Sequence, residues 1–205
     1  MTLLQRIMVV QFATILALVQ NAQGSKRPKI PEQPEVLVQS LYNEVIARHP
    51  VGIPGSADMK TFAPYLSKSL LRRIDLARAC EDNYYRQHQN PNEKPEIEWL
   101  EFGLFTGGNE KVSPRAFQVE TAQSDKDGSY RVYVRLTWGP PSKPWIWRVT
   151  AIVVREDDHF VVDEIVFMKD EKTLEDESRL TEILAAGCDG ARWIGYKDQR
   201  SDPKR

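Results

Sequence analysis

The chain has 205 residues, and its 28 Lys and Arg against 29 Asp and Glu give a formal charge of −1. This near-neutral charge argues against a dedicated nucleic-acid binder, and two cysteines are too few for a disulfide-dense scaffold or a Cys-rich zinc module. Hydrophobic residues make up 41%, which is typical of a folded protein, and the length suits one domain or at most two small ones.

The first 24 residues have the features of a secretory signal peptide. Arg6 precedes a mostly apolar segment, 7–19, which is shorter than the roughly 20 residues that a membrane-spanning helix needs. Ala22 and Gly24 are small residues at the −3 and −1 positions of a cleavage site, and cleavage after Ala22 or an uncleaved anchor are the alternatives. We therefore expect a periplasmic or secreted protein without a stable membrane anchor after cleavage.

The next part of the chain predicts a linker and then helices. Residues 25–34 are basic and rich in proline, which favours a linker. Helical spacing then predicts a helix over 35–48 and, after a loop, a short helix over 59–66 that Pro64 breaks. Ser67 is a suitable N-cap for a longer helix to about His88. The apolar stripe of the first helix comprises Val38, Leu41, Tyr42, Val45 and His49.

From residue 97 the hydrophobic period changes to that of strands. The expected strands cover 97–105, 117–121, 130–138, 145–155 and 159–168, with a hairpin turn at 125–128. The strand 145–155 is apolar on both faces toward its end and should lie centrally in the sheet. A short helix is expected over about 176–186, and 197–205 should be a flexible tail. Helices followed by antiparallel strands predict one α+β domain over 35–196.

Four segments resemble a known family. They are FAPYLSKSLLRRIDLA (62–77), KPEIEWLEFGLFTGG (94–108), DGSYRVYVRLTW (127–138) and HFVVDEIVF (159–167). Together they resemble the secreted bacterial family called domain of unknown function 3828, over about residues 35–170. The resemblance implies a nuclear-transport-factor-two-like (cystatin-like) cone, in which N-terminal helices pack on a curved antiparallel sheet with a concave pocket. Enzymes, ligand binders and dimerisation modules share that fold, so it does not fix a function.

Two sets of residues are candidates for special roles. In an oxidising compartment Cys80 and Cys188 would form a disulfide, and two separate buried thiols are the alternative. The second set consists of aromatic residues and arginines of the predicted strands. Together they could form a ligand pocket, with aromatic walls and with arginines that bind an anionic group. The alternative is that the tryptophans lie in the core and the arginines on an exposed face. The candidate pocket residues are Trp99, Tyr133, Arg135, Trp147 and Arg148.

Catalytic and metal motifs give weaker indications. Asp163 or Glu98 with Tyr133 would suit an isomerase that uses a pocket carboxylate, but nothing local separates these acids from solvated ones. The three histidines are scattered without metal-ligand spacing, and we expect neither a metal nor a cofactor. We therefore expect a non-enzymatic module that binds a small ligand or an envelope protein, and a homodimer is possible. The alternatives are a small hydrolase or isomerase and an immunity or inhibitor-type protein.

Overall fold

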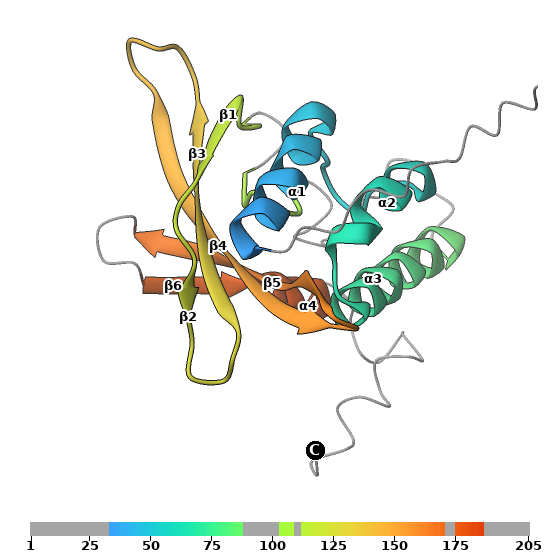
Figure 1. Cartoon of the computed structure of the whole chain (residues 1–205). Helices are drawn as coiled ribbons and strands as arrows, with labels where there is room; N and C mark the ends of the chain where they lie inside the picture. The colour runs from blue at the N-terminus through green and yellow to red at the C-terminus, as the bar shows by residue number, and fades with distance from the viewer. Residues whose placement is uncertain (1–32, 88–102, 109–111, 171–174, 187–205) are drawn as a thin grey trace, which may run out of the picture.

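The computed structural model describes residues 33–87, 103–108, 112–170 and 175–186. The predicted signal peptide, most of the linker, the first part of the strand expected at 97–105, Cys188 and the predicted tail lie outside these residues. Within them, helices come first and an antiparallel sheet follows, as the sequence predicts (Figure 1). The chain is therefore α+β.

Helix α1 spans Pro34–Arg48 and places Leu37, Val38, Leu41, Tyr42 and Val45 in the core. Proline at the first helical position loses no helical hydrogen bond, because the N–H there has no partner within the helix. The sequence-based stripe was wrong at its end, where His49 is exposed. His49 has a φ of 47° and caps the helix with its N–H on the Val45 carbonyl, so it leaves the helical path and points away from the core.

Helix α2 (Ser56–Phe62) continues into the 3-10 turn η1 (Ala63–Tyr65), which contains Pro64, and α3 follows over Lys68–Gln87. The predicted N-cap is confirmed, since the Ser67 hydroxyl oxygen accepts a hydrogen bond of 2.9 Å from the Leu70 N–H. Leu70, Ile74 and Ala77 lie on the buried side of α3.

The sheet has the strand order β1-β3-β4-β5-β6, with all pairings antiparallel, and β2 also pairs with β3. The strands are β1 (Ala116–Val119), β2 (Gln123–Ser124), β3 (Tyr130–Trp138), β4 (Trp145–Glu156), β5 (His159–Asp170) and β6 (Glu175–Arg179). The central position of the 145–155 strand is confirmed, because β4 lies between β3 and β5. The hairpin turn at 125–128 is also confirmed: the Gly128 N–H donates to the Asp125 carbonyl, and Gly128 has a φ of 85°.

The two faces of the sheet differ in burial. Along β3, Val132, Val134 and Leu136 are fully buried against the helices, and we call their side the helix face. The alternate residues, Arg131, Tyr133, Arg135 and Thr137, are half-buried and lie on the opposite side, which we call the far face. Figure 1 shows α1, α2 and α3 on one side of the sheet. The alternation in the sequence predicted this division.

Two local predictions were wrong. Residues 103–105, the end of a predicted strand, form a tight turn in which the Thr106 and Gly107 N–H groups donate to the Gly103 carbonyl. Residues 175–179, where the last helix was expected to begin, form the edge strand β6, and α4 covers only Leu180–Ala186. The sequence of β6 is polar throughout, so only its pairing with β5 makes it a strand.

Candidate functional site

Two arginines lie side by side on the far face. Arg135 on β3 is directly opposite Arg148 on β4, and because paired residues of adjacent strands point to the same side, both guanidinium groups share this face. Residues on either side of them, such as Val134 and Val149, are buried on the helix face. We call Arg135 and Arg148 the arginine pair.

One carboxylate bridges the arginine pair. Glu120 follows β1, and its Oε1 accepts a hydrogen bond of 2.9 Å from Nη2 of Arg148 and lies 3.5 Å from Nη2 of Arg135. The Nε atoms of both arginines are buried, and neither has a hydrogen-bond partner within the described part of the chain. These three side chains carry two positive charges and one negative, so the cluster keeps a net charge of +1 with unused donors.

The structure groups the predicted pocket residues only in part. Tyr133 lies two positions from Arg135 on the same face of β3, so Tyr133 and the arginine pair share one surface. Trp147 is on the helix face, where its indole N–H donates a 2.7 Å hydrogen bond to the Thr106 carbonyl. Trp99 lies outside the described residues. Glu120 was not among the predicted pocket residues, because its approach to the arginines depends on the register of β1 on β3.

The described carboxylates near the sheet are engaged in structural contacts. Asp163 accepts a 2.5 Å hydrogen bond from the Ser67 hydroxyl, at the start of α3. Glu164 is 7% exposed and accepts hydrogen bonds from the N–H of Ile165, the N–H of Thr181 and the hydroxyl of Thr181. Burial raises the pKa of Glu164, and the Thr181 hydrogen bonds oppose that rise. Both acids are satisfied by protein donors, so this geometry does not single out a general base. Glu98 lies outside the described residues.

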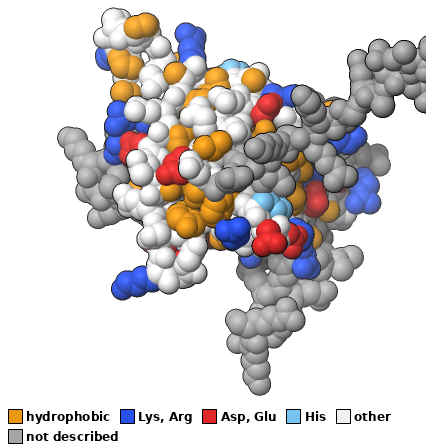
Figure 2. Space-filling view, viewed as in Figure 1, with side chains coloured by type: hydrophobic (Ala, Val, Ile, Leu, Met, Phe, Trp, Pro, Cys, Tyr) orange, Lys and Arg blue, Asp and Glu red, His pale blue; other side chains and the backbone are white. Residues whose placement is uncertain are grey.

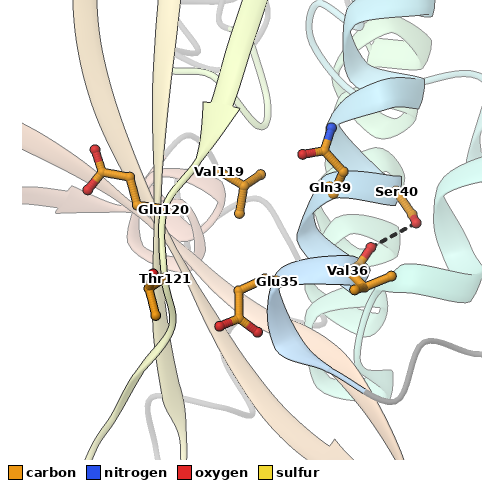
Figure 3. Close-up of a pocket in the computed structure, with 7 residues that line it drawn as sticks. All are labelled: Glu35, Val36, Gln39, Ser40, Val119, Glu120 and Thr121. Carbon is orange, nitrogen blue, oxygen red and sulfur yellow. Dashed lines mark hydrogen bonds between the residues drawn. The ribbon is translucent and has the colours of Figure 1, made fainter.

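A shallow hollow of about 360 Å³ lies between α1 and the end of β1 (Figure 3). The side chain of Glu35 points from α1 toward the sheet, and its Oε1 accepts a 2.9 Å hydrogen bond from the Ala122 N–H. Ser40 donates to the Val36 carbonyl at 2.8 Å, within the same helix. Glu120 points away from α1 in this view, toward the far face. Glu35 therefore fastens α1 to the sheet edge.

Only one of the two cysteines of the predicted disulfide lies within the described residues. Cys80 is 8% exposed on α3 and is not a free thiol, but Cys188 lies outside the described residues. The pairing of Cys80 with Cys188 therefore stays a prediction. A thiol count on the denatured protein tests it, because two reactive thiols per chain would contradict the pairing.

The described residues hold no candidate metal site and no candidate membrane span. No group of three or more His, Cys, Asp or Glu side chains in this part of the chain is arranged to hold a metal ion. No described helix is long and apolar enough to cross a bilayer.

Comparisons with known proteins do not identify a family. No protein-family model matches the chain, and no curated protein matches its sequence. Among solved structures the chain is similar to a protein of unknown function from Bacteroides thetaiotaomicron, with 17% identity and a TM-score of 0.30. The match covers 64% of this chain and 83% of the other. A TM-score this low supports no argument about fold or function.

Proposed function

We propose that the protein is a non-enzymatic binding module of the cell envelope whose ligand carries a carboxylate or phosphate group. The observation that supports the proposal is the arginine pair, in which two facing guanidinium groups share a single carboxylate oxygen. A periplasmic or secreted location is part of the proposal and rests on the signal-like segment 1–24.

The charge balance of the pair favours a second anion. Like charges directly opposite each other on adjacent strands destabilise a sheet, and Glu120 offsets only one of the two. Guanidinium groups present forked donors that match carboxylate and phosphate oxygens. Arg135 is 39% exposed, so a small anion in solvent has access to it, with Tyr133 beside it on the same face. An oxyanion at this place would complete the neutralisation that Glu120 begins.

The fold proposal is separate from the ligand proposal. We propose that the helices and the antiparallel sheet form a nuclear-transport-factor-two-like cone, in the family called domain of unknown function 3828. The support is the resemblance of the four sequence segments and the order of helices before strands. A structure of the protein that left the sheet flat, without a concave face, would contradict this assignment.

Titration calorimetry of the full chain with phosphate, succinate and citrate tests the ligand proposal. We expect saturable binding of at least one of these anions, weakened about tenfold or more by Arg148→Ala, because a charge-assisted hydrogen bond contributes about 1.5–3 kcal/mol. Arg148→Lys keeps the charge but lacks the fork, so it should restore only part of the affinity. The matched control is Arg131→Ala, which removes an arginine from the same face of β3 but one that pairs with Asp125.

A second variant distinguishes a binding site from a structural ion network. Glu120→Gln removes the internal competitor and should tighten anion binding several-fold, since both guanidinium groups then lose the one carboxylate that pairs with them within the described residues. Each variant is compared with the wild type by thermal melting, so that a folding defect is recognised. If none of the three anions binds to the wild type or to Glu120→Gln, the arginine pair is a structural network and the proposal fails.

A further inference from the structure

The connection between β3 and β4 carries an exposed group of apolar side chains. We call Trp138, Pro140, Lys143, Pro144, Trp145 and Ile146, which surround a shallow hollow there, the tryptophan tip. Trp145 is 58% exposed and Ile146 is 37% exposed, whereas the rest of β4 from Val149 to Val153 is largely buried. Figure 1 shows this hairpin end standing clear of the helices, and Figure 2 shows hydrophobic side chains gathered on it.

The tryptophan tip is ordered by its own contacts. Trp138 faces Trp145 across the strands with ring centroids 6.3 Å apart, and Trp145 lies 6.5 Å from Trp147. The Lys143 N–H donates to the Pro140 carbonyl at 3.0 Å, and three prolines restrict the connection 139–144. A surface that is already ordered loses little conformational entropy when it binds.

Two cationic side chains lie at or beside the tip. The arginines elsewhere in the hairpin do not contribute, because Arg131 and Arg155 lie toward its opposite end and the arginine pair shares Glu120. Lys143 lies at the tip itself, and Arg115 lies beside it, since the Arg115 N–H donates to the Thr137 carbonyl. Neither Lys143 nor Arg115 forms an ion pair with another described residue. Apolar rings with unneutralised cations beside them complement a surface with an anionic outer layer and an apolar layer beneath it.

We propose that the tryptophan tip inserts into the headgroup region of a bilayer that contains anionic lipids. Tryptophan is favoured at this depth because its ring is apolar and its N–H is polar, and lysine keeps its ammonium among the phosphates while its stem lies along the apolar layer. The tip projects from the body of the domain. A protein partner would need a matching concave surface to receive it, whereas a bilayer needs no preformed shape. The cations favour anionic lipids over neutral ones. This inference is independent of the arginine pair.

Vesicle cosedimentation of the full chain tests the inference, with phosphatidylcholine vesicles compared with vesicles that also contain phosphatidylglycerol. The intact mass of each preparation is recorded, so that wild type and variants are compared with the same N-terminus. We expect binding to the mixed vesicles and a loss of about tenfold or more for the double variant Trp145→Ala, Ile146→Ser. Lys143→Glu should weaken binding to the mixed vesicles and reduce the preference for anionic lipid.

Two control variants match these changes. Tyr85→Ala removes an exposed aromatic side chain, 47% exposed, from α3, and Lys126→Glu reverses an exposed charge in the β2–β3 turn. Both should bind vesicles as the wild type does. The proposal is overturned if the wild type fails to bind the mixed vesicles or if the double variant binds them equally well. Sedimentation velocity of the same double variant gives a further check. If the double variant loses self-association that the wild type shows, while its vesicle binding is unchanged, the tip is a protein contact and the proposal is overturned.

Discussion

The central strand β4 ends in two hairpins of opposite character. At one end, residues 139–144 connect it to β3 through a proline-rich segment that is followed by the exposed Trp145. At the other end, only Asp157 and Asp158 connect it to β5, both with positive φ, as a two-residue turn requires. The same strand is therefore joined once by a tight polar turn and once by a longer apolar one.

The tight turn is integrated into the fold, whereas the long connection is not. Lys68, the first residue of α3, forms an ion pair with Asp157 and donates its N–H to Glu156 at 3.3 Å. Next to it, the Ser67 N–H donates to the Val162 carbonyl at 2.9 Å, which fixes α3 to β5. Trp145 and Ile146, by contrast, leave apolar surface in solvent, where it contributes little to folding. We infer that the β4–β5 end stabilises the domain and that the tryptophan tip is available for contacts outside it.

A pair of truncations on the same strand should show the largest difference between the two ends of β4. Val153→Ala, at the buried end of β4, should destabilise the protein by about 2 kcal/mol, because it removes two buried methyl groups and leaves a cavity. Trp145→Ala should change stability by less than about 0.5 kcal/mol despite the larger deletion. Urea unfolding measures both. A loss for Trp145→Ala as large as that for Val153→Ala would show that the tip belongs to the core.

The anchoring of α3 gives the next largest effect. Ser67→Ala should cost about 1–2 kcal/mol, since it removes the N-cap of the helix and leaves Asp163 without its hydroxyl donor. Ser69→Ala, two residues further on at an exposed position, is the matched control and should be nearly neutral. Thermal melts of the two variants should differ clearly, and equal melting temperatures would contradict the capping role.

Backbone substitutions in the two connections should have opposite signs. Asp158 has a φ of 66°, a conformation that costs less for glycine, so Asp158→Gly should stabilise the protein by about 0.5 kcal/mol after the entropy of the unfolded glycine is counted. Gly139 has a φ of 91°, and Gly139→Ala should destabilise by about 1 kcal/mol. Chemical denaturation resolves the two signs. A destabilised Asp158→Gly would mean that its side chain stabilises the turn.

The smallest effect concerns the pH dependence of stability at Glu164. The pKa of Glu164 is raised in the folded protein, so the folded state binds this proton more tightly than the unfolded chain does. The free energy of unfolding therefore falls as the pH rises from 4.5, the ordinary pKa of a glutamate, through the raised pKa. Glu164→Gln offers the same acceptor to the Ile165 and Thr181 N–H groups but does not titrate. We therefore expect the free energy of unfolding of Glu164→Gln, relative to that of the wild type, to increase across this pH window and to level off above it.

The counterpart of that variant is Thr181→Val. Removing the hydroxyl that donates to Glu164 should raise the pKa of the carboxyl further, because this hydrogen bond lowers it. The fall of stability with pH should then extend to higher pH than in the wild type. Urea unfolding at a series of pH values measures all three proteins, and parallel curves for wild type and Glu164→Gln would contradict the burial of a titrating carboxyl.

The candidate site was accessible to sequence reasoning only in part. Alternation along 130–138 predicts that Tyr133 and Arg135 share a face, and the structure confirms it. The same period of two separates Trp147 from Arg148, because neighbours in a strand point to opposite faces. Glu120 could not be predicted, since no local spacing encodes that the end of β1 lies beside β3, within reach of both arginines.

Features that depend on neighbours along the chain could be predicted before the fold was known. These are the amphipathic helix, predicted at 35–48 and found at 34–48, the Ser67 cap, the turn at 125–128 and the two faces of β3, because propensity, capping and periodicity act over a few residues. Features that depend on distant partners follow from the three-dimensional arrangement of the strands. The polar segment 175–179 is a strand because the edge of β5 offers hydrogen bonds, and the arginine pair exists because the β3–β4 register sets Arg135 opposite Arg148.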